Sequence, residues 1–146
     1  MKLRLLAMLA LTGALTAHAS DEHSIQALEG YDPVAYFTDN KAVRGDGFIK
    51  SEYEGLIYLF TSKEHKAQFD KNPSKYAPQF GGWCSYGVSV NKKFHADPRA
   101  FVVYQDKLYV NVNADILKKF KADLPGNVKK AEGNWTQIQE KAEGSL

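Results

Sequence analysis

The sequence predicts a single small α+β domain with two antiparallel β-hairpins, a central helix and two C-terminal helices. Short runs rich in β-branched and aromatic residues occur in two pairs, and only a few turn-forming residues separate the members of each pair. Segments with apolar residues at helical spacing lie between and after these pairs. Hairpins and helices in this order are typical of an α+β domain.

The N-terminus has the pattern of a cleavable signal peptide. Lys2 and Arg4 precede an uncharged apolar run over residues 5–16, and Ala17 and Ala19 provide the small residues that a signal peptidase cleaves after. The apolar run is shorter than the roughly 20 residues that a membrane-spanning helix needs. We therefore expect cleavage after Ala19, a periplasmic location and no stable membrane insertion after cleavage.

The expected mature chain is electrically balanced. Without Lys2 and Arg4 it keeps 17 basic residues against 17 acidic ones, so its formal net charge is zero. This balance gives no indication of a nucleic acid or an anionic membrane surface as a partner. Both methionines lie in the signal peptide, and Cys84 is the single cysteine of the chain, so no internal disulfide can form.

The sequence divides into four parts. We expect the signal peptide over residues 1–19, a flexible lead-in over 20–29, the folded domain over 30–141 and a C-terminal tail over 142–146. No internal repeat is evident from the pattern.

The predicted domain begins with a short strand over residues 34–37, after the turn signal Asp32-Pro33. The first hairpin pairs residues 48–53 with 56–60. Thr61 is the expected N-cap of the central helix, which runs to about Asp70.

The second half of the domain is predicted with one open alternative. Residues 81–88 form either a short buried helix or a glycine-kinked loop, and a polar loop follows over residues 91–98. The second hairpin pairs residues 101–104 with 108–111. Asn113 caps a helix through about Ala122, Pro125-Gly126 ends it, and the last helix covers residues 127–141.

Several sequence blocks resemble the YHS family, and in particular the exported YHS-domain proteins of Gram-negative bacteria. The blocks are Gly-Tyr-Asp-Pro-Val-Ala-Tyr-Phe over residues 30–37, Tyr-Leu-Phe-Thr-Ser over 58–62, Asn-Pro-Ser-Lys-Tyr over 72–76 and Ala-Pro-Gln-Phe-Gly-Gly-Trp-Cys over 77–84. The resemblance implies a YHS-type core, similar to a treble-clef module. It also implies a link to metals, because short YHS modules are attached to copper-transporting ATPases.

The cysteine ligands of the short YHS modules are not kept in this chain. Their three cysteine positions fall on Ala35, Thr61 and His65. The thiolate cluster is therefore lost, and only His65 offers a metal-binding side chain at one of these positions.

The candidate metal ligands are Cys84, His95, His65 and Asp97. A set of one thiolate, imidazoles and a carboxylate suits copper or zinc. Each residue also has a structural alternative. Cys84 can be a buried small apolar residue, His65 a hydrogen-bonded core histidine, and His95 with Asp97 part of an exposed turn.

The sequence thus favours a periplasmic binding protein that holds a metal ion through Cys84 and histidines. The alternative is a module that binds a non-metal ligand or a protein on an aromatic surface, with a purely structural Cys84. A thiol-dependent enzyme is a third hypothesis, although the sequence contains no hydrolase, phosphate-binding or zinc-protease motif.

Overall fold

The structure is a computed structural model that describes residues 25–146. The predicted signal peptide and its cleavage site lie outside the described residues. The predicted α+β class is confirmed, with all elements in one small domain. In chain order they are β1 (Ile25–Gln26), η1 (Ala27–Gly30), α1 (Ala35–Thr38), β2 (Asp46–Tyr53), β3 (Leu56–Phe60), α2 (Lys63–Lys71), α3 (Pro73–Tyr76), η2 (Gln79–Gly82), α4 (Ser85–Ser89), β4 (Asp97–Tyr104), β5 (Lys107–Asn111), α5 (Ala114–Ala122), α6 (Leu124–Ile138) and η3 (Glu143–Ser145).

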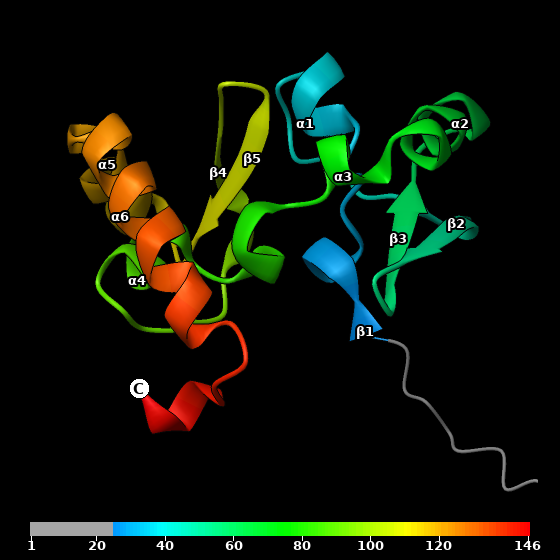
Figure 1. Cartoon of the computed structure of the whole chain (residues 1–146). Coiled ribbons are helices and arrows are strands. Elements are labelled where there is room, and N and C mark those ends of the chain that lie inside the picture. The colour runs from blue at the N-terminus through cyan, green and yellow to red at the C-terminus, as the bar shows by residue number, and fades with distance from the viewer. Residues whose placement is uncertain (1–24) are drawn as a thin grey trace, which may run out of the picture.

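The strands form two small sheets. One has the order β1-β3-β2, with β1 parallel and β2 antiparallel to β3, and the other is the antiparallel pair β4-β5. Figure 1 shows the first sheet with α2 in one lobe and the second sheet with α4, α5 and α6 in the other. Within residues 25–146, no helix is both long enough and apolar enough to cross a membrane.

Most of the described chain consists of two copies of one structural unit, which the sequence pattern did not reveal; the greater part of α6 and η3 follow the second copy. We name residues 25–76 the first repeat and residues 77–127 the second repeat. Each repeat begins with a residue that pairs in parallel with the second strand of the hairpin. Gln26 pairs with Ile57 of β3 in the first repeat, and Pro78 pairs with Leu108 of β5 in the second. A left-handed turn, a short helix, a hairpin and a longer helix follow in the same order.

The left-handed backbone positions of the two repeats coincide when one extra residue of the first repeat, between Thr38 and Asn40, is left unpaired. All residues with positive φ among the described ones fall at equivalent positions. The pairs are Leu28 with Phe80, Glu29 with Gly81, Gly30 with Gly82, Asn40 with Asn91, Glu54 with Gln105, and Gly55 with Asp106. Because L-residues rarely adopt this conformation, six coincident pairs indicate that the two units are the same fold.

The hairpins also match in register and in their irregularities. The β2–β3 register shifts between Asp46 and Lys50, and the β4–β5 register shifts between Asp97 and Phe101. At each bulge the aspartate carboxylate accepts a hydrogen bond from the backbone N–H two residues later, at 2.9 Å in both repeats. Asp97 therefore has an exact structural counterpart in Asp46.

The structure differs from the prediction at one domain boundary and in the type of one element. Residues 25–29 belong to the fold and not to a lead-in, because Ala27 and Leu28 are buried in the apolar core. Residues 34–37 were predicted to be a strand, but α1 covers residues Ala35–Thr38. The Asp32 carboxylate accepts hydrogen bonds from the N–H groups of Val34 and Ala35, so it starts a helix at this point.

The helix termini correct two further predictions. Ser62, and not Thr61, caps α2 by accepting a hydrogen bond from the His65 backbone N–H. Pro125 and Gly126 do not end a helix but lie in the first turn of α6, where a proline is tolerated because its missing N–H would be unpaired anyway. The predicted Asn113 cap of α5 is confirmed.

Candidate functional site

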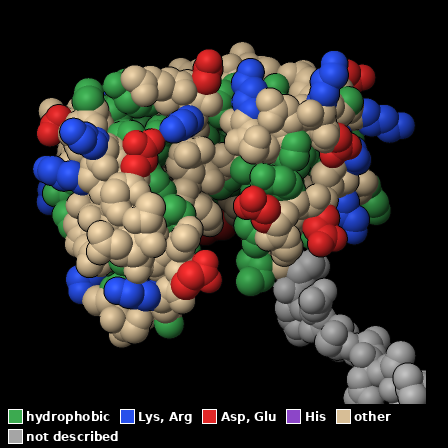
Figure 2. All heavy atoms as spheres, viewed as in Figure 1, with side chains coloured by type: hydrophobic (Ala, Val, Ile, Leu, Met, Phe, Trp, Pro, Cys, Tyr) green, Lys and Arg blue, Asp and Glu red, His purple; other side chains and the backbone are tan. Residues whose placement is uncertain are grey.

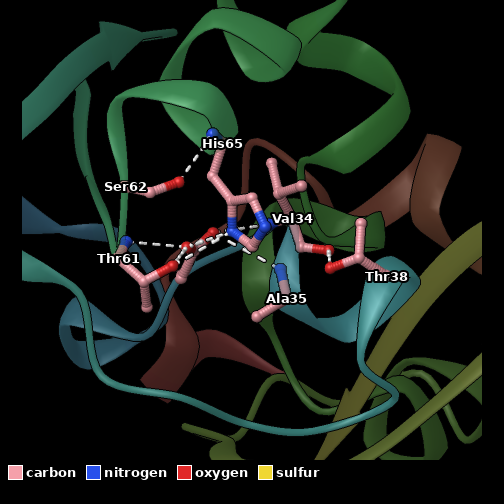
Figure 3. A network of polar contacts seen from close by, with 7 residues as sticks. Val34, Ala35, Thr38, Thr61, Ser62 and His65 are labelled. Atoms are coloured by element: carbon pink, nitrogen blue, oxygen red, sulfur yellow. Dashed lines mark hydrogen bonds and ion pairs between the residues drawn. The ribbon is translucent and has the colours of Figure 1, made fainter.

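A buried carboxylate organises the first repeat. Asp32 is fully buried, and its carboxylate accepts hydrogen bonds from the backbone N–H and the hydroxyl of Thr61, at 2.8 and 2.7 Å. The His65 ring Nδ1 lies 2.7 Å from the same carboxylate oxygen. Figure 3 shows how this network joins the start of α1 to the residues that precede and begin α2. The network thus joins both Asp32 carboxylate oxygens, the Thr61 hydroxyl, the Ser62 hydroxyl and the His65 Nδ1 to partners within the first repeat.

His65 fills the centre of that network with its ring. Since an ionised carboxylate only accepts hydrogen bonds, Nδ1 of His65 carries a proton. The side chain is 16% exposed, so the imidazole covers the Asp32 carboxylate from solvent. In the first repeat the space beside the Asp32 carboxylate is therefore filled by a side chain of the protein, the His65 imidazole.

The second repeat has an open pocket at the equivalent position. The pocket measures about 390 Å³, and its wall is almost entirely apolar. Each lining residue is equivalent to one residue of the first repeat. The pairs are Cys84 with Asp32, Tyr86 with Val34, Gly87 with Ala35, Val90 with Thr38, Phe94 with Val43, Val112 with Thr61, Asn113 with Ser62, and Ile116 with His65.

The pocket is open because the second repeat has lost the side chains that close the first. Ile116 is shorter than His65 and cannot hydrogen-bond, so it does not bridge α5 to Cys84 as His65 bridges α2 to Asp32. Val112 likewise replaces the Thr61 hydroxyl with a methyl group. Val90, Phe94 and Val112 remain among the exposed large apolar residues of the described chain.

Gly87 shapes one wall of the pocket. A Cβ atom on Gly87 would lie 2.8 Å from the Phe94 ring, closer than real Cβ contacts allow. In the first repeat the sizes are reversed: Ala35 is larger than the equivalent Gly87, and Val43 is smaller than the equivalent Phe94. Absence of a side chain at Gly87 therefore makes room for the Phe94 ring.

Cys84 performs part of the capping role of Asp32. Its Sγ accepts a hydrogen bond from the Gly87 N–H at 3.4 Å, just as Asp32 accepts one from the Ala35 N–H at 3.4 Å. The second N–H of the helix start, that of Tyr86, is bound at 3.1 Å by the side-chain oxygen of Asn111, which also lies 3.8 Å from Sγ. The thiol is fully buried.

Two buried polar atoms beneath the pocket have no partner among the described residues. They are the Ser85 hydroxyl oxygen and the Asn111 amide nitrogen. The first repeat has apolar Pro33 and Phe60 at these positions. The second repeat therefore differs from the first both in its apolar pocket and in the polar groups that lie under it.

The four predicted metal ligands each have other contacts. Cys84 is buried at the pocket floor, and His65 is paired with Asp32. His95 stacks on Trp83 with ring centroids 5.0 Å apart. Within residues 25–146, no group of three or more His, Cys, Asp or Glu side chains is arranged to hold a metal ion.

His95 lies in the loop before β4, whereas Asp97, predicted to lie in a loop, is the first residue of β4. The His95 side chain is 84% exposed, and its Nε2 is 3.3 Å from the Glu143 carboxylate. Asp97 binds the Arg99 guanidinium through both carboxylate oxygens. The hydrogen bonds from Arg99 hold the pKa of Asp97 below its usual range.

A smaller hollow of about 200 Å³ lies between the repeats. Its wall includes the residues of η1, the glycines of η2 and His95. Figure 2 shows the surface hollowed between the two lobes.

Sequence reasoning missed Asp32, Asn111 and Ile116 as site residues. The sequence does contain a signal of the internal repeat, because seven equivalent positions carry the same residue in both repeats. The identical pairs are Gly30 and Gly82, Asn40 and Asn91, Lys41 and Lys92, Asp46 and Asp97, Tyr53 and Tyr104, Tyr58 and Tyr109, and Phe69 and Phe120. An alignment of the chain with itself at a period of roughly 50 residues would have paired Asp32 with Cys84 and His65 with Ile116.

Comparisons of this chain with protein-family models, with curated proteins and with solved structures found no match. The resemblance to the YHS family therefore stays a prediction from the sequence blocks.

Proposed function

We propose that this chain is an exported binding protein that holds a small, uncharged, apolar molecule in the pocket beside Cys84. The observation that carries the proposal is the difference between the repeats at one site. In the first repeat the side chains of Asp32, Thr61 and His65 form a hydrogen-bonded network, whereas the equivalent residues Cys84, Val112 and Ile116 line an apolar pocket in the second repeat. Since the fold closes this site without any ligand in one repeat, the opening in the other needs an explanation.

The size and lining of the pocket support a small molecule as its occupant. Pockets for small molecules measure about 300–1,000 Å³ and are lined mainly by apolar and aromatic side chains. The pocket of about 390 Å³ falls in this range, and none of its lining residues is charged. A ligand bound there would cover the exposed surfaces of Val90 and Phe94.

The signal-peptide pattern over residues 1–19 supports export as part of the proposal. An exported protein with one thiol needs to keep that thiol from oxidation, and the buried position of Cys84 is consistent with this requirement. In this proposal Cys84 is a capping residue and part of the pocket floor.

Copper or zinc binding through Cys84, His95, His65 and Asp97 stays a prediction. It is supported by the resemblance to metal-associated YHS modules and not by a cluster of ligands within residues 25–146. A metal titration of the mature chain and of Cys84→Ser tests it directly. Stoichiometric binding that is lost in Cys84→Ser would favour the metal function over the apolar ligand.

The apolar-ligand proposal is tested with the fluorescent probe 1-N-phenylnaphthylamine and the mature chain. We expect the probe to bind saturably to the unmodified chain. Ile116→Trp should bind it at least about tenfold more weakly, because the indole ring of the new side chain fills the pocket. Phe48→Trp is the matched control, because Phe48 is 96% exposed and lies outside this pocket. Equal probe binding by Ile116→Trp and the unmodified chain would refute the proposed site.

A further inference from the structure

We infer that the ligand of the pocket beside Cys84 carries a flat, uncharged aromatic ring, and that His65 marks the ring's place in the first repeat. This inference rests on the proposed function and adds the chemical class of the ligand.

The first repeat shows which shape fits this site. The imidazole of His65 occupies it, held by a 2.7 Å contact from Nδ1 to Asp32 and a 3.1 Å contact to the Thr61 hydroxyl. Figure 3 shows the ring reaching from α2 toward Val34 and Ala35 at the start of α1. The site between these segments therefore accepts a planar five-membered ring, which in this repeat is part of the chain.

The second repeat keeps the same backbone frame but provides no ring of its own. Ile116 takes the place of His65. Asn113 still caps α5 as Ser62 caps α2, and the distances from the backbone nitrogen to the capping oxygen are 2.9 and 3.1 Å. The frame of the site is thus preserved while its occupant is missing. A ring from a separate molecule is the occupant that this frame fits.

Two aromatic residues of the pocket favour a ring over an aliphatic chain. Phe94 and Tyr86 replace the aliphatic Val43 and Val34 of the first repeat. Aromatic side chains interact with one another in stacked or edge-on arrangements that add to the burial of apolar area. The second repeat therefore has aromatic walls at the site where it has no ring of its own at the His65 position.

The ring is expected to be uncharged. No lining residue carries a charge, and the side-chain oxygen of Asn113 is occupied by the α5 cap. The Cys84 sulfur accepts from Gly87 and lies beside the Asn111 oxygen, so it provides no charged partner either. Burial of an unpaired ligand charge in such a site is unfavourable.

A comparison of shape-matched ligands tests the inference on the full mature chain. Benzyl alcohol has the flat ring, cyclohexylmethanol is its saturated analogue, 1-hexanol is acyclic, and benzoate adds a charge. We expect NMR titration to show benzyl alcohol binding at least about tenfold more tightly than each of the other three, with shifts at the Phe94, Val112 and Ile116 signals. Equal or tighter binding of cyclohexylmethanol or 1-hexanol would overturn the inference.

The same titration separates the inference from the proposed function. Binding of all uncharged apolar compounds without preference for the ring would refute only the inference. Binding of none of these compounds and of no phenylnaphthylamine would refute both.

A second experiment tests the equivalence of the two sites. His65→Gly removes the ring from the first repeat, and we expect added imidazole to raise the melting temperature of this variant. Imidazole should not stabilise the unmodified chain or the matched control His95→Gly. If His65→Gly does not fold, His65→Ala serves the same purpose. Absence of any imidazole effect on the folded variant would contradict a ring-shaped site in this frame.

Discussion

Asp32 and Cys84 occupy equivalent positions in the two repeats, and each accepts a hydrogen bond at 3.4 Å from the backbone N–H three residues later. The carboxylate of Asp32 additionally binds Thr61 and His65, whereas the thiol of Cys84 has only Asn111 beside it. The residue at this position therefore belongs to a polar network in the first repeat and to the pocket floor in the second.

Removal of the His65 ring should destabilise the first repeat. His65→Ala leaves the buried Asp32 carboxylate without one of its donors, and hydrogen bonds to charged groups contribute about 1.5–3 kcal/mol. We expect urea denaturation to show a fall of about 2 kcal/mol in the free energy of unfolding. His95→Ala is the control, because its exposed ring should change this free energy by less than about 0.5 kcal/mol. A smaller loss for His65→Ala than for His95→Ala would contradict the role of the network.

The Cys84 thiol should be protected in the folded chain. The residue has no exposed surface, so a reagent reaches the sulfur only after local opening. We expect Ellman's reagent to react at least about 100-fold more slowly with the native chain than with the chain in guanidinium chloride. Benzyl alcohol should slow the native reaction further, because a bound ligand would stabilise the closed state against the local opening that exposes the sulfur. A native rate close to the denatured rate would show that the thiol is accessible.

Three buried tyrosines should make the fold sensitive to high pH. Burial raises the pKa of Tyr109 to about 12 and raises the pKa values of Tyr36 and Tyr58 further above the ordinary value of 10.0. The unfolded chain then releases these protons first as the pH rises through about 10, so the unfolded state gains stability relative to the native state. Stability is kept below that pH and is lost progressively above it.

The alkaline effect is measured by urea denaturation between pH 8 and pH 11. Each of the three tyrosines steepens the fall of the unfolding free energy above pH 10 by up to about 1.4 kcal/mol per pH unit. Tyr109→Phe removes one of these groups and should give a shallower fall. An identical pH profile for Tyr109→Phe and the unmodified chain would show that this hydroxyl titrates normally.

Local patterns were enough to predict the hairpins and the Asn113 cap. Residues 56–60 form β3 as predicted, because a short run of aliphatic and aromatic residues directly after a Glu-Gly turn is typical of the second strand of a hairpin. The predicted strand over residues 34–37 failed for a reason that is not local. Asp32 fixes the helical start of α1, but its carboxylate is held there by Thr61 and His65 from the next hairpin and helix.

The candidate site was predictable only in part. Cys84 stands out in the sequence as the single cysteine, and the structure places it at the pocket floor. Its partners come from the hairpin and helix that follow, so no local pattern could show that Phe94, Val112 and Ile116 share a pocket with it. His65 was one of two histidines, with His95, predicted to bind a metal ion together with Cys84, and the structure places His65 in the first repeat and Cys84 in the second.

Gly133 offers a stabilising substitution that tests the description of α6. It lies within the helix, and a Cβ atom added there would meet nothing within 4 Å. Gly133→Ala should therefore raise the free energy of unfolding by about 1 kcal/mol, because alanine restricts the unfolded chain and favours the helix. Gly126→Ala in the same helix is the matched control. Its Cβ atom would lie 2.2 Å from the Asp123 carboxylate that caps α6, so the cap would be displaced at a cost of about 1 kcal/mol. Thermal and urea denaturation of the two variants should move in opposite directions, and a loss of stability in Gly133→Ala would show that the helix is not regular at this residue.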